Sequence, residues 1–306
     1  MNKLATLDQI QLTEWLETAQ TAAQAYQGRV IERIPQLAKA QPHWFAAQLY
    51  FGPDQIYSLG DRTLSFPFMS VIKPFLLLYL LEIRGDKAVS QWVGVEPSEA
   101  SFNSLDQLIA DQGRPRNPML NSGAIALADK LPGQTAAERC QILCTWLNEL
   151  AGCHLWLDEA MLASVRSAGR ERNQTITRYL AKRGRLENVA IALDTYEQIC
   201  CLSGQVKDLA SLGTLLAYDT PHIQTSHRRS VNALMLTCGL YEASGAFAVR
   251  IGLPMKSGIS GALLAIIPGQ GAIACYSPAV DTVGNSVAGL AFIETVSHHL
   301  GLSLFE

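Results

Sequence analysis

The spacing of apolar residues predicts an amphipathic helix near the start of the chain. Over residues 7–27, apolar and small side chains recur every three or four positions, as they do along one face of a helix: Leu12, Trp15, Leu16, Ala19, Ala23 and Tyr26. Two extended runs follow at about 44–51 and 55–59, with Gly52, Pro53 and Asp54 between them. Two such runs around turn residues are typical of a β-hairpin, which we expect here.

The pattern is helical from about residue 70 to residue 240. Within this region, Thr135 and Glu138 have the spacing of a capping box, and apolar residues recur at helical intervals over 143–150. Gly239 follows the run 236–238 and is expected to end a helix. The region therefore predicts a large helical part in the middle of the chain.

Strands return near the C-terminus. Runs at 259–267 and 272–276 flank a turn sequence and predict a second hairpin, and 287–300 has a helical period. Strands at both ends with helices between them predict an α+β fold, in which one antiparallel sheet contains both terminal segments and a large helical insertion separates them. We expect a single domain over 1–306, with a sheet part at about 1–67 and 245–306 and a helical part at about 68–244.

The composition is that of a globular protein with few charges. The 306 residues are 48% hydrophobic and 17% charged, against roughly 25% charged in average soluble domains. The apolar fraction excludes a disordered chain, and 24 basic against 27 acidic residues argue against nucleic acid as a partner. The apolar run Pro74–Leu81 is too short to span a membrane, and the N-terminus has no apolar signal segment. We therefore expect a cytoplasmic protein with a small-molecule partner.

The cysteine and histidine positions predict neither disulfides nor a metal site. Seven cysteines show no C-x-x-C spacing, and without an export signal they are expected to be reduced core thiols. His298 and His299 are adjacent, so they would lie on different faces of a helix, and no H-E-x-x-H pair occurs. We expect no metal and no cofactor.

Ser70 and Lys73 are the first candidates for chemistry. Three residues apart on a helix, they would lie on one face, and the apolar run 74–81 would bury the lysine. A buried lysine loses its proton more readily and could take the proton of a serine. Because so short a motif arises easily by chance, an ordinary surface pair is the alternative.

Lys256, Ser257 and Gly258 form a rarer motif just before the second hairpin. A glycine there allows a backbone or a substrate to approach closely. A Ser-x-x-Lys at a helix start, a helical insertion and a Lys-Ser-Gly near a terminal strand resemble the layout of penicillin-binding proteins and serine β-lactamases.

A larger set of motifs resembles the serine-dependent glutaminases, which share that β-lactamase-like fold. The resemblance covers about residues 30–295. It is carried by Ile34–Ala38, Ser70–Lys73, Asn117–Ile125, Tyr196, Asp208–Ala210, Cys238–Gly245, Gly252–Gly258, Ser277–Pro278 and Gly284–Ser286. Together these stretches are too many and too specific to be explained by chance.

The resemblance implies hydrolysis of glutamine to glutamate and ammonia through an acyl-enzyme. It implies Ser70 as the nucleophile, Lys73 as its base, and the backbone N–H groups of Ser70 and Ile259 as donors to the oxyanion. Tyr241 matches a site tyrosine that could relay a proton to the leaving ammonia. Asn121, Asn173 and Tyr196 fall on substrate-binding positions. Because the family is commonly oligomeric, a dimer or a tetramer is also implied.

Two positions depart from the family pattern. The family has a glutamate seven residues before Asn173, where this chain has Arg166, or Val165 if one residue is inserted. The family also has a tyrosine directly before the Ile-Pro stretch, where this chain has Arg33. Because arginine suits carboxylates rather than ammonium groups, we expect Arg33 and Arg166 to take part in substrate binding. Two alternatives follow: an amidohydrolase acting on a more anionic amide, and a non-catalytic homologue that binds a metabolite.

The stretch 166–185 is strongly basic. It carries six arginines and one lysine against the single acid Glu171. An anion or effector site is one interpretation, and a solvated helix face with arginine–acid pairs is the other.

Overall fold

The N-terminal and C-terminal segments form one antiparallel sheet, as predicted. The computed structural model describes residues 9–52 and 55–306. The strand order is β2-β1-β8-β7-β6, and every neighbouring pair is antiparallel. The strands are β1 (Ala46–Tyr50), β2 (Ile56–Gly60), β6 (Met255–Ser257), β7 (Ala262–Ile267) and β8 (Gly271–Tyr276). The expected α+β class is therefore confirmed.

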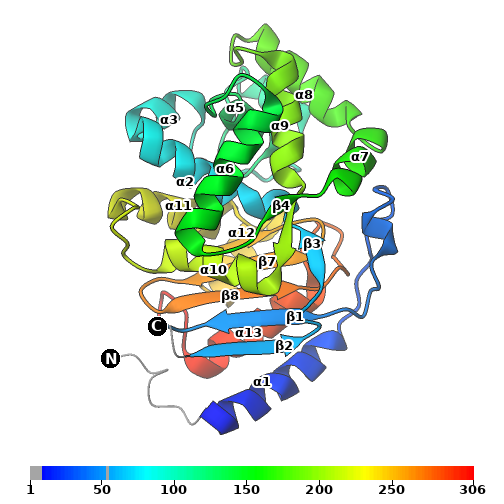
Figure 1. Ribbon diagram of the computed structural model, residues 1–306, viewed down its shortest axis with the longest axis vertical. Coiled ribbons are helices and arrows are strands. Elements are labelled where there is room, and N and C mark those ends of the chain that lie inside the picture. The colour runs from blue at the N-terminus through cyan, green and yellow to red at the C-terminus, as the bar shows by residue number, and fades with distance from the viewer. Residues whose placement is uncertain (1–8, 53–54) are drawn as a thin grey trace.

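Helices cover both faces of this sheet. On one face lie α1 (Gln9–Gln24) and α13 (Val287–Leu300), which pack against each other, and on the opposite face lies α10 (Val206–Ala217) (Figure 1). The protein has two hydrophobic clusters, one on each face of the sheet, and alternate residues of β7 pack into them. Leu263 belongs to the cluster with α1 and α13, and Leu264 belongs to the cluster with α10. This alternation explains why every residue of β7 is buried.

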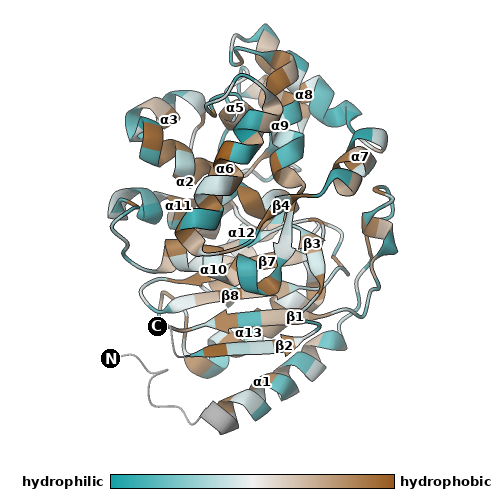
Figure 2. Ribbon diagram, viewed as in Figure 1, coloured by the Kyte–Doolittle hydropathy of each residue, from teal (hydrophilic) through white to brown (hydrophobic). Residues whose placement is uncertain are grey.

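Most of the remaining helices form a second layer above α10 (Figure 1). Figure 2 shows that α8 is largely hydrophilic, whereas hydrophobic residues concentrate on the strands and the inner helices. The α-helices of this layer are α2 (Lys73–Arg84), α3 (Asp86–Trp92), α4 (Leu105–Ala110), α5 (Asn121–Ala128), α6 (Ala136–Ala151), α7 (Glu159–Ser167), α8 (Glu171–Lys182), α9 (Val189–Cys200) and α11 (Thr225–Cys238). The short helix α12 (Ser244–Arg250) lies on the side of α13 instead: Phe247 packs against the cluster that contains α1 and α13, and Arg250 pairs with Glu294 of α13. The short 3₁₀ helices of the described residues are η2 (Leu37–Lys39), η3 (Met69–Ile72) and η4 (Tyr241–Ala243).

Several expected boundaries need correction. The strand expected at 259–267 begins at Ala262, because a tight turn closed by the Gly261 N–H to the Gly258 carbonyl occupies the residues before it. The first helix spans Gln9–Gln24 within the described residues, and the expected turn residues Pro53 and Asp54 lie outside them. A second sheet was not predicted, because its strands have only two to four residues: β3 (Ser65–Pro67), β5 (Leu202–Gln205) and β4 (Trp156–Leu157).

The predicted helix ends at Thr135 and Gly239 are confirmed. Thr135 and Glu138 form a capping box at the start of α6, and Gly239 follows the last residue of α11. Gly239 has an ordinary φ of −80°, so its backbone conformation does not require glycine. Glycine is needed here because β6 approaches closely: a Cβ atom on residue 239 would lie 1.7 Å from the carbonyl oxygen of Met255.

The cysteines and the hydropathy of the helices agree with the composition. All seven cysteines are buried and free of disulfides. Across residues 9–52 and 55–306, no helix combines the length and the apolar character needed to cross a membrane.

Candidate active site

Ser70 and Lys73 lie at the junction between the two parts of the fold. Ser70 is in η3, which follows β3 directly, and Lys73 is the first residue of α2. The Lys73 N–H donates to the Ser70 carbonyl, so both residues belong to one continuous helical segment. Met69, just before the serine, has a φ of +48°, a strained value for a non-glycine residue. The strain lies at the position that orients the Ser70 side chain.

The amine of Lys73 is fully buried and held by two acceptors. It donates one hydrogen bond to the carbonyl of Met119 and one to Asn121 Oδ1, each at 2.8 Å. Burial lowers the pKa of Lys73 to about 8, and the nearby Cys200 opposes this shift. A neutral amine has two N–H bonds and one lone pair, so these two acceptors leave the lone pair available to accept a proton.

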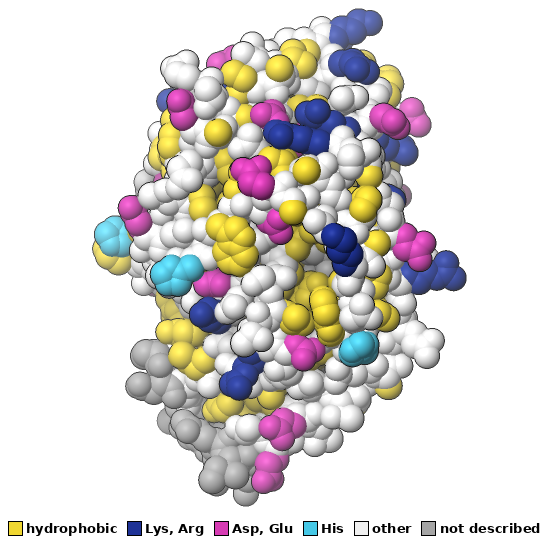
Figure 3. All heavy atoms as spheres, turned by 45° about the vertical axis from the view of Figure 1, so that its right-hand side comes forward, with side chains coloured by type: hydrophobic (Ala, Val, Ile, Leu, Met, Phe, Trp, Pro, Cys, Tyr) yellow, Lys and Arg dark blue, Asp and Glu magenta, His cyan; other side chains and the backbone are white. Residues whose placement is uncertain are grey.

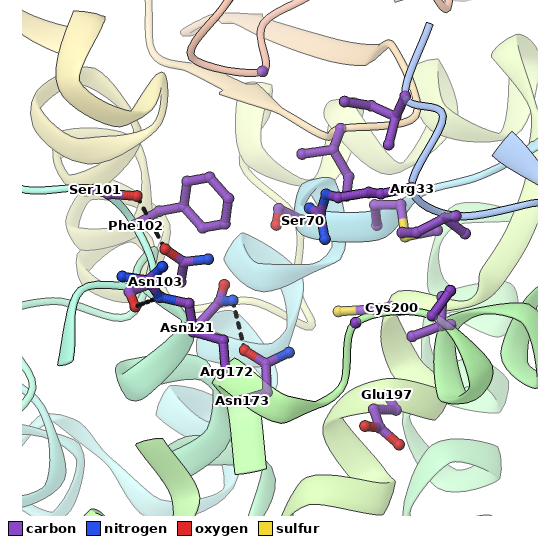
Figure 4. A pocket seen from close by; sticks show the side chains of 18 of the residues that line it. Arg33, Ser70, Ser101, Phe102, Asn103, Asn121, Arg172, Asn173, Glu197 and Cys200 are labelled. Carbon is purple, nitrogen blue, oxygen red and sulfur yellow. Dashed lines mark hydrogen bonds between the residues drawn. The ribbon is translucent and has the colours of Figure 1, made fainter. Parts of the chain in front are cut away.

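Asn121 connects the lysine to the opposite wall of the site. Its Oδ1 also accepts a hydrogen bond from the Tyr196 hydroxyl at 2.9 Å, and its Nδ2 donates to Asn173 Oδ1 at 2.9 Å (Figure 4). The three predicted side chains therefore come from α5, α8 and α9 and meet in one network. Burial strongly raises the pKa of Tyr196, so its hydroxyl remains a donor.

Tyr241 lies beside the Lys-Ser-Gly strand. Its hydroxyl donates to the Ser257 carbonyl at 3.1 Å, and the amine of Lys256 lies 4.5 Å from the centre of its ring. Burial raises the pKa of Tyr241, and a hydrogen bond with the Ser70 side chain works against that rise. Burial also lowers the pKa of Lys256, and the nearby Lys73 lowers it further. The phenol is therefore protonated and lies close to both Ser70 and the Lys256 amine.

The Lys-Ser-Gly motif precedes the hairpin strand β7, as expected, and its first two residues belong to the edge strand β6, which was not predicted. A Cβ atom on Gly258 would lie 2.6 Å from the Phe68 carbonyl oxygen, so glycine lets β6 approach η3 this closely. The next residue, Ile259, lines the same cavity as Ser70. Its N–H donates no hydrogen bond among the residues that the structure describes, so it can serve as a donor toward that cavity.

A cavity of about 470 Å³ collects these side chains. It is lined by Arg33, Ser70, Asn121, Asn173, Tyr196 and Ile259 from the predicted set. Figure 4 shows the guanidinium group of Arg33 pointing toward Ser70. Lys73, Tyr241, Lys256 and Ser257 are buried behind this surface. The volume suits a small molecule.

Arg166 is not among the described residues that line the cavity. Its neighbour Val165 does line the cavity. Val165 is the residue at the family's glutamate position if one residue is inserted before Asn173. The guanidinium of Arg166 forms an ion pair with Asp194 and lies 3.7 Å from Glu197 Oε2. Glu171 is exposed at the start of α8 and does not line the cavity either. The proposed contact between Arg166 and substrate stays a prediction that this geometry does not favour.

The basic stretch 166–185 is divided between several roles. Arg166 and Arg170 form ion pairs with acids of α9, Arg172 lines the cavity and donates to the Asn103 carbonyl, and Arg183 donates to the Gln112 carbonyl. Figure 3 shows Lys and Arg side chains gathered toward the helical end of the molecule. The stretch is therefore not one uniform solvated face.

Arg172, Cys200 and Glu197 all line the cavity. Sequence reasoning missed Cys200 and Glu197, and it included Arg172 only as part of the basic stretch 166–185. Arg172 directly precedes Asn173, and Glu197 and Cys200 follow Tyr196 on α9. Their positions next to, or one turn after, predicted site residues were the available signal. In residues 9–52 and 55–306, no group of three or more His, Cys, Asp or Glu side chains is placed to hold a metal ion.

The sequence model of the family described as Glutaminase matches residues 28–305. The chain belongs to this glutaminase family. A glutaminase of Synechocystis sp. is 46% identical over 282 residues, covering 92% of this chain and 86% of that protein. A glutaminase of Vibrio parahaemolyticus is 37% identical, covering 91% of this chain and 94% of the relative.

Solved glutaminase structures have the same fold. A structure described as "Probable glutaminase ybaS" superposes with a TM-score of 0.91 at 31% identity, covering 98% of this chain and all of the other. A probable glutaminase from Bacillus subtilis, complexed with 6-diazo-5-oxo-L-norleucine, gives a TM-score of 0.86 at 29% identity, covering 98% of this chain and 97% of that one. The expected β-lactamase-like fold is therefore confirmed.

Proposed function

We propose that this chain hydrolyses L-glutamine to L-glutamate and ammonia through an acyl-enzyme on Ser70. The observation that carries the proposal is the environment of Lys73. Both N–H bonds of its neutral amine have acceptors, its pKa is lowered to about 8, and Ser70 lies one helical turn before it. Membership of the glutaminase family supplies the substrate.

In the first half-reaction, Ser70 Oγ attacks the side-chain amide carbon and its proton passes to Lys73 Nζ. The N–H groups of Ser70 and Ile259 stabilise the negative oxygen of the tetrahedral intermediate. The C–N bond then breaks, and the nitrogen leaves as ammonia after taking a proton from the Tyr241 hydroxyl. The proton that Lys73 took from Ser70 then passes to the Tyr241 oxygen and restores the phenol. The phenol carries a proton for this transfer because burial raises its pKa.

In the second half-reaction, a water molecule attacks the ester carbon and gives its proton to Lys73. The C–O bond to Ser70 breaks, Ser70 Oγ takes the proton back, and glutamate leaves. Asn121, Asn173 and Tyr196 are proposed to bind the polar groups of the substrate, because amide and phenol groups match its donors and acceptors. Arg33 is proposed to bind its α-carboxylate.

The test is an ammonia assay with the purified full-length protein and L-glutamine. We expect saturable ammonia release that Ser70→Ala abolishes, with a covalent acyl-enzyme detectable by mass spectrometry after rapid acid quench. Glutamine turnover that is unchanged in Ser70→Ala would contradict the mechanism. The absence of turnover with any amide, together with thermal stabilisation by glutamate, would favour a metabolite-binding homologue.

A second candidate is an amidohydrolase that prefers a more anionic amide. The observation that favours it is the pair of guanidinium groups, Arg33 and Arg172, on the cavity wall. An amide with a second carboxylate would then have a higher kcat/KM than glutamine. Assaying both substrates under one condition decides between the two candidates.

We also propose a cytoplasmic location and a homodimer or homotetramer. Seven buried free thiols fit a reducing compartment. Light scattering after size-exclusion chromatography checks the oligomeric state, and cell fractionation checks the location.

A further inference from the structure

A buried carboxylate with one incompletely bonded oxygen lies on the α9 side of the cavity. Glu197 lines the cavity next to Tyr196 and has a side chain that is 1% exposed. Its Oε1 accepts a hydrogen bond from Arg170 Nε at 2.8 Å. Its Oε2 accepts no hydrogen bond within the described part of the chain. Glu197 and Cys200 both belong to α9, and Figure 4 shows Glu197 at the far side of the site from Arg33.

The charged groups around Glu197 balance one another, so its carboxylate is not surrounded by an excess of positive charge. Arg170 bonds to its Oε1, and Arg166 is divided between Asp194 and Oε2, from which it is 3.7 Å away. Two arginines thus face two carboxylates. An additional donor would satisfy Oε2, because a buried carboxylate oxygen without a hydrogen bond is costly.

We propose that Glu197 determines specificity for amino-acid amides by stabilising the α-ammonium group of the substrate. The family position for this role is Val165 in this chain, which lines the same cavity and carries no charge. Glu197 places a carboxylate on the neighbouring helix, on the opposite side of the cavity from Arg33. Burial raises the pKa of this carboxyl, and the hydrogen bond from Arg170 and the charges of Arg170 and Arg166 oppose that rise and favour the charged form. The cavity thereby has an anionic and a cationic side, which suits the zwitterionic end of an amino acid.

Asp281 is the other acid that lines the cavity among the described residues, and it is already engaged. Its Oδ1 accepts hydrogen bonds from the backbone N–H groups of Val283, Gly284 and Asn285. These bonds hold the turn after residue 281, so this carboxylate has a structural function. Glu197 is the one of the two whose oxygen lacks a hydrogen bond.

The inference rests on the proposed function, and its test compares two substrates. L-Glutamine and 4-carbamoylbutanoate share the amide and the carboxylate, and only glutamine carries the α-ammonium group. We expect Glu197→Gln to lower kcat/KM for glutamine by about 10- to 100-fold, mainly through KM. The same variant should change kcat/KM for 4-carbamoylbutanoate by less than about threefold.

Asp194→Asn is the matched control. It removes one charge from the same ion-pair cluster, but Asp194 does not line this cavity. We expect it to leave the ratio of the two kcat/KM values within about twofold of the wild type. Circular dichroism and the Tm establish that both variants fold.

The inhibition constants of L-glutamate and glutarate provide a second readout that does not require turnover of the poorer substrate. The wild type should prefer glutamate, and Glu197→Gln should lose that preference. The inference is overturned if Glu197→Gln weakens the binding of glutamate and glutarate by the same factor, or weakens the binding of neither. Wild-type protein without glutamine turnover overturns the proposed function instead, and calorimetry with glutamate and glutarate then still tests Glu197.

Discussion

Asn121 Oδ1 lies 2.8 Å from Lys73 Nζ and accepts a hydrogen bond from this fully buried amine. An amide oxygen is a neutral acceptor, so it holds the lysine in place without favouring its charged form as strongly as a carboxylate would. Burial lowers the pKa of Lys73 to about 8, and a neutral partner does not reverse that shift as a carboxylate would. Burial and a neutral partner together explain how this lysine can act as a base near neutral pH.

The first prediction concerns the pH dependence. Lys73 acts as a base only when neutral, and its pKa is lowered to about 8, so kcat/KM should rise about tenfold per pH unit below pH 8 and level off above it. Initial rates with glutamine between pH 6 and pH 9.5 measure this profile. A flat profile across that range would show that Lys73 is not the titrating base.

The second prediction places a carboxylate beside the lysine. Asn121→Asp keeps the shape of the side chain but adds a negative charge next to Lys73 Nζ, which raises the pKa of the lysine by about one unit or more. The pH profile should shift toward alkaline values, and activity at pH 7 should fall by at least about tenfold. Asn173→Asp is the matched control, since Asn173 contacts Asn121 rather than Lys73. An equal shift in both variants would contradict the assignment.

The third prediction concerns the close approach at Gly258. In Gly258→Ala, the added methyl group would lie 2.6 Å from the Phe68 carbonyl and force β6 away from η3. We expect a loss of stability of about 1–3 kcal/mol and a larger loss of kcat than of substrate affinity, because Ile259 moves relative to Ser70. Gly245→Ala on α12 is the control: nothing lies within 4 Å of its Cβ, so about 0.5–1 kcal/mol of stabilisation is expected. Urea unfolding measures both.

The extent of sequence-based prediction differed between parts of the site. Ser70 and Lys73 were found because a helix brings residues three apart onto one face, and Asn121, Asn173 and Tyr196 came from the family resemblance. Glu197 was not found, because it carries no motif and its role depends on how α8 and α9 pack. Arg166 was expected near the substrate, yet its guanidinium pairs with Asp194, since spacing alone does not reveal which way a side chain turns.

The fold shows the same division. Four of the five strands of the larger sheet follow from two hairpins with clear apolar runs and turn residues, whereas the three-residue edge strand β6 was not predicted. The three-stranded sheet could not be seen, because β4 has two residues and pairs with β5 far along the chain. Pairing over such a separation is decided by tertiary packing rather than by local pattern.

The fourth prediction tests the ion-pair cluster. Arg166→Glu would leave three carboxylates facing one another, namely Asp194, Glu197 and the introduced glutamate. We expect a loss of about 1–2 kcal/mol in the free energy of unfolding. Arg166→Gln removes the ion pair without adding a like charge and should lose less. Equal losses in the two variants would show that the cluster does not couple these charges.

The fifth prediction moves the negative charge back to the family position. Val165 and Glu197 line the same cavity, so Val165→Glu combined with Glu197→Gln transfers the carboxylate from α9 to α7. If the site requires one carboxylate for the α-ammonium group, the kcat/KM of the double variant for glutamine should be at least about tenfold higher than that of Glu197→Gln. Val165→Gln in the same background is the control, because it adds a side chain of similar size without charge and should recover nothing. Recovery by both variants would mean that cavity size, rather than charge, selects the substrate, and recovery by Val165→Glu alone would show that the two positions supply the same charge from different helices.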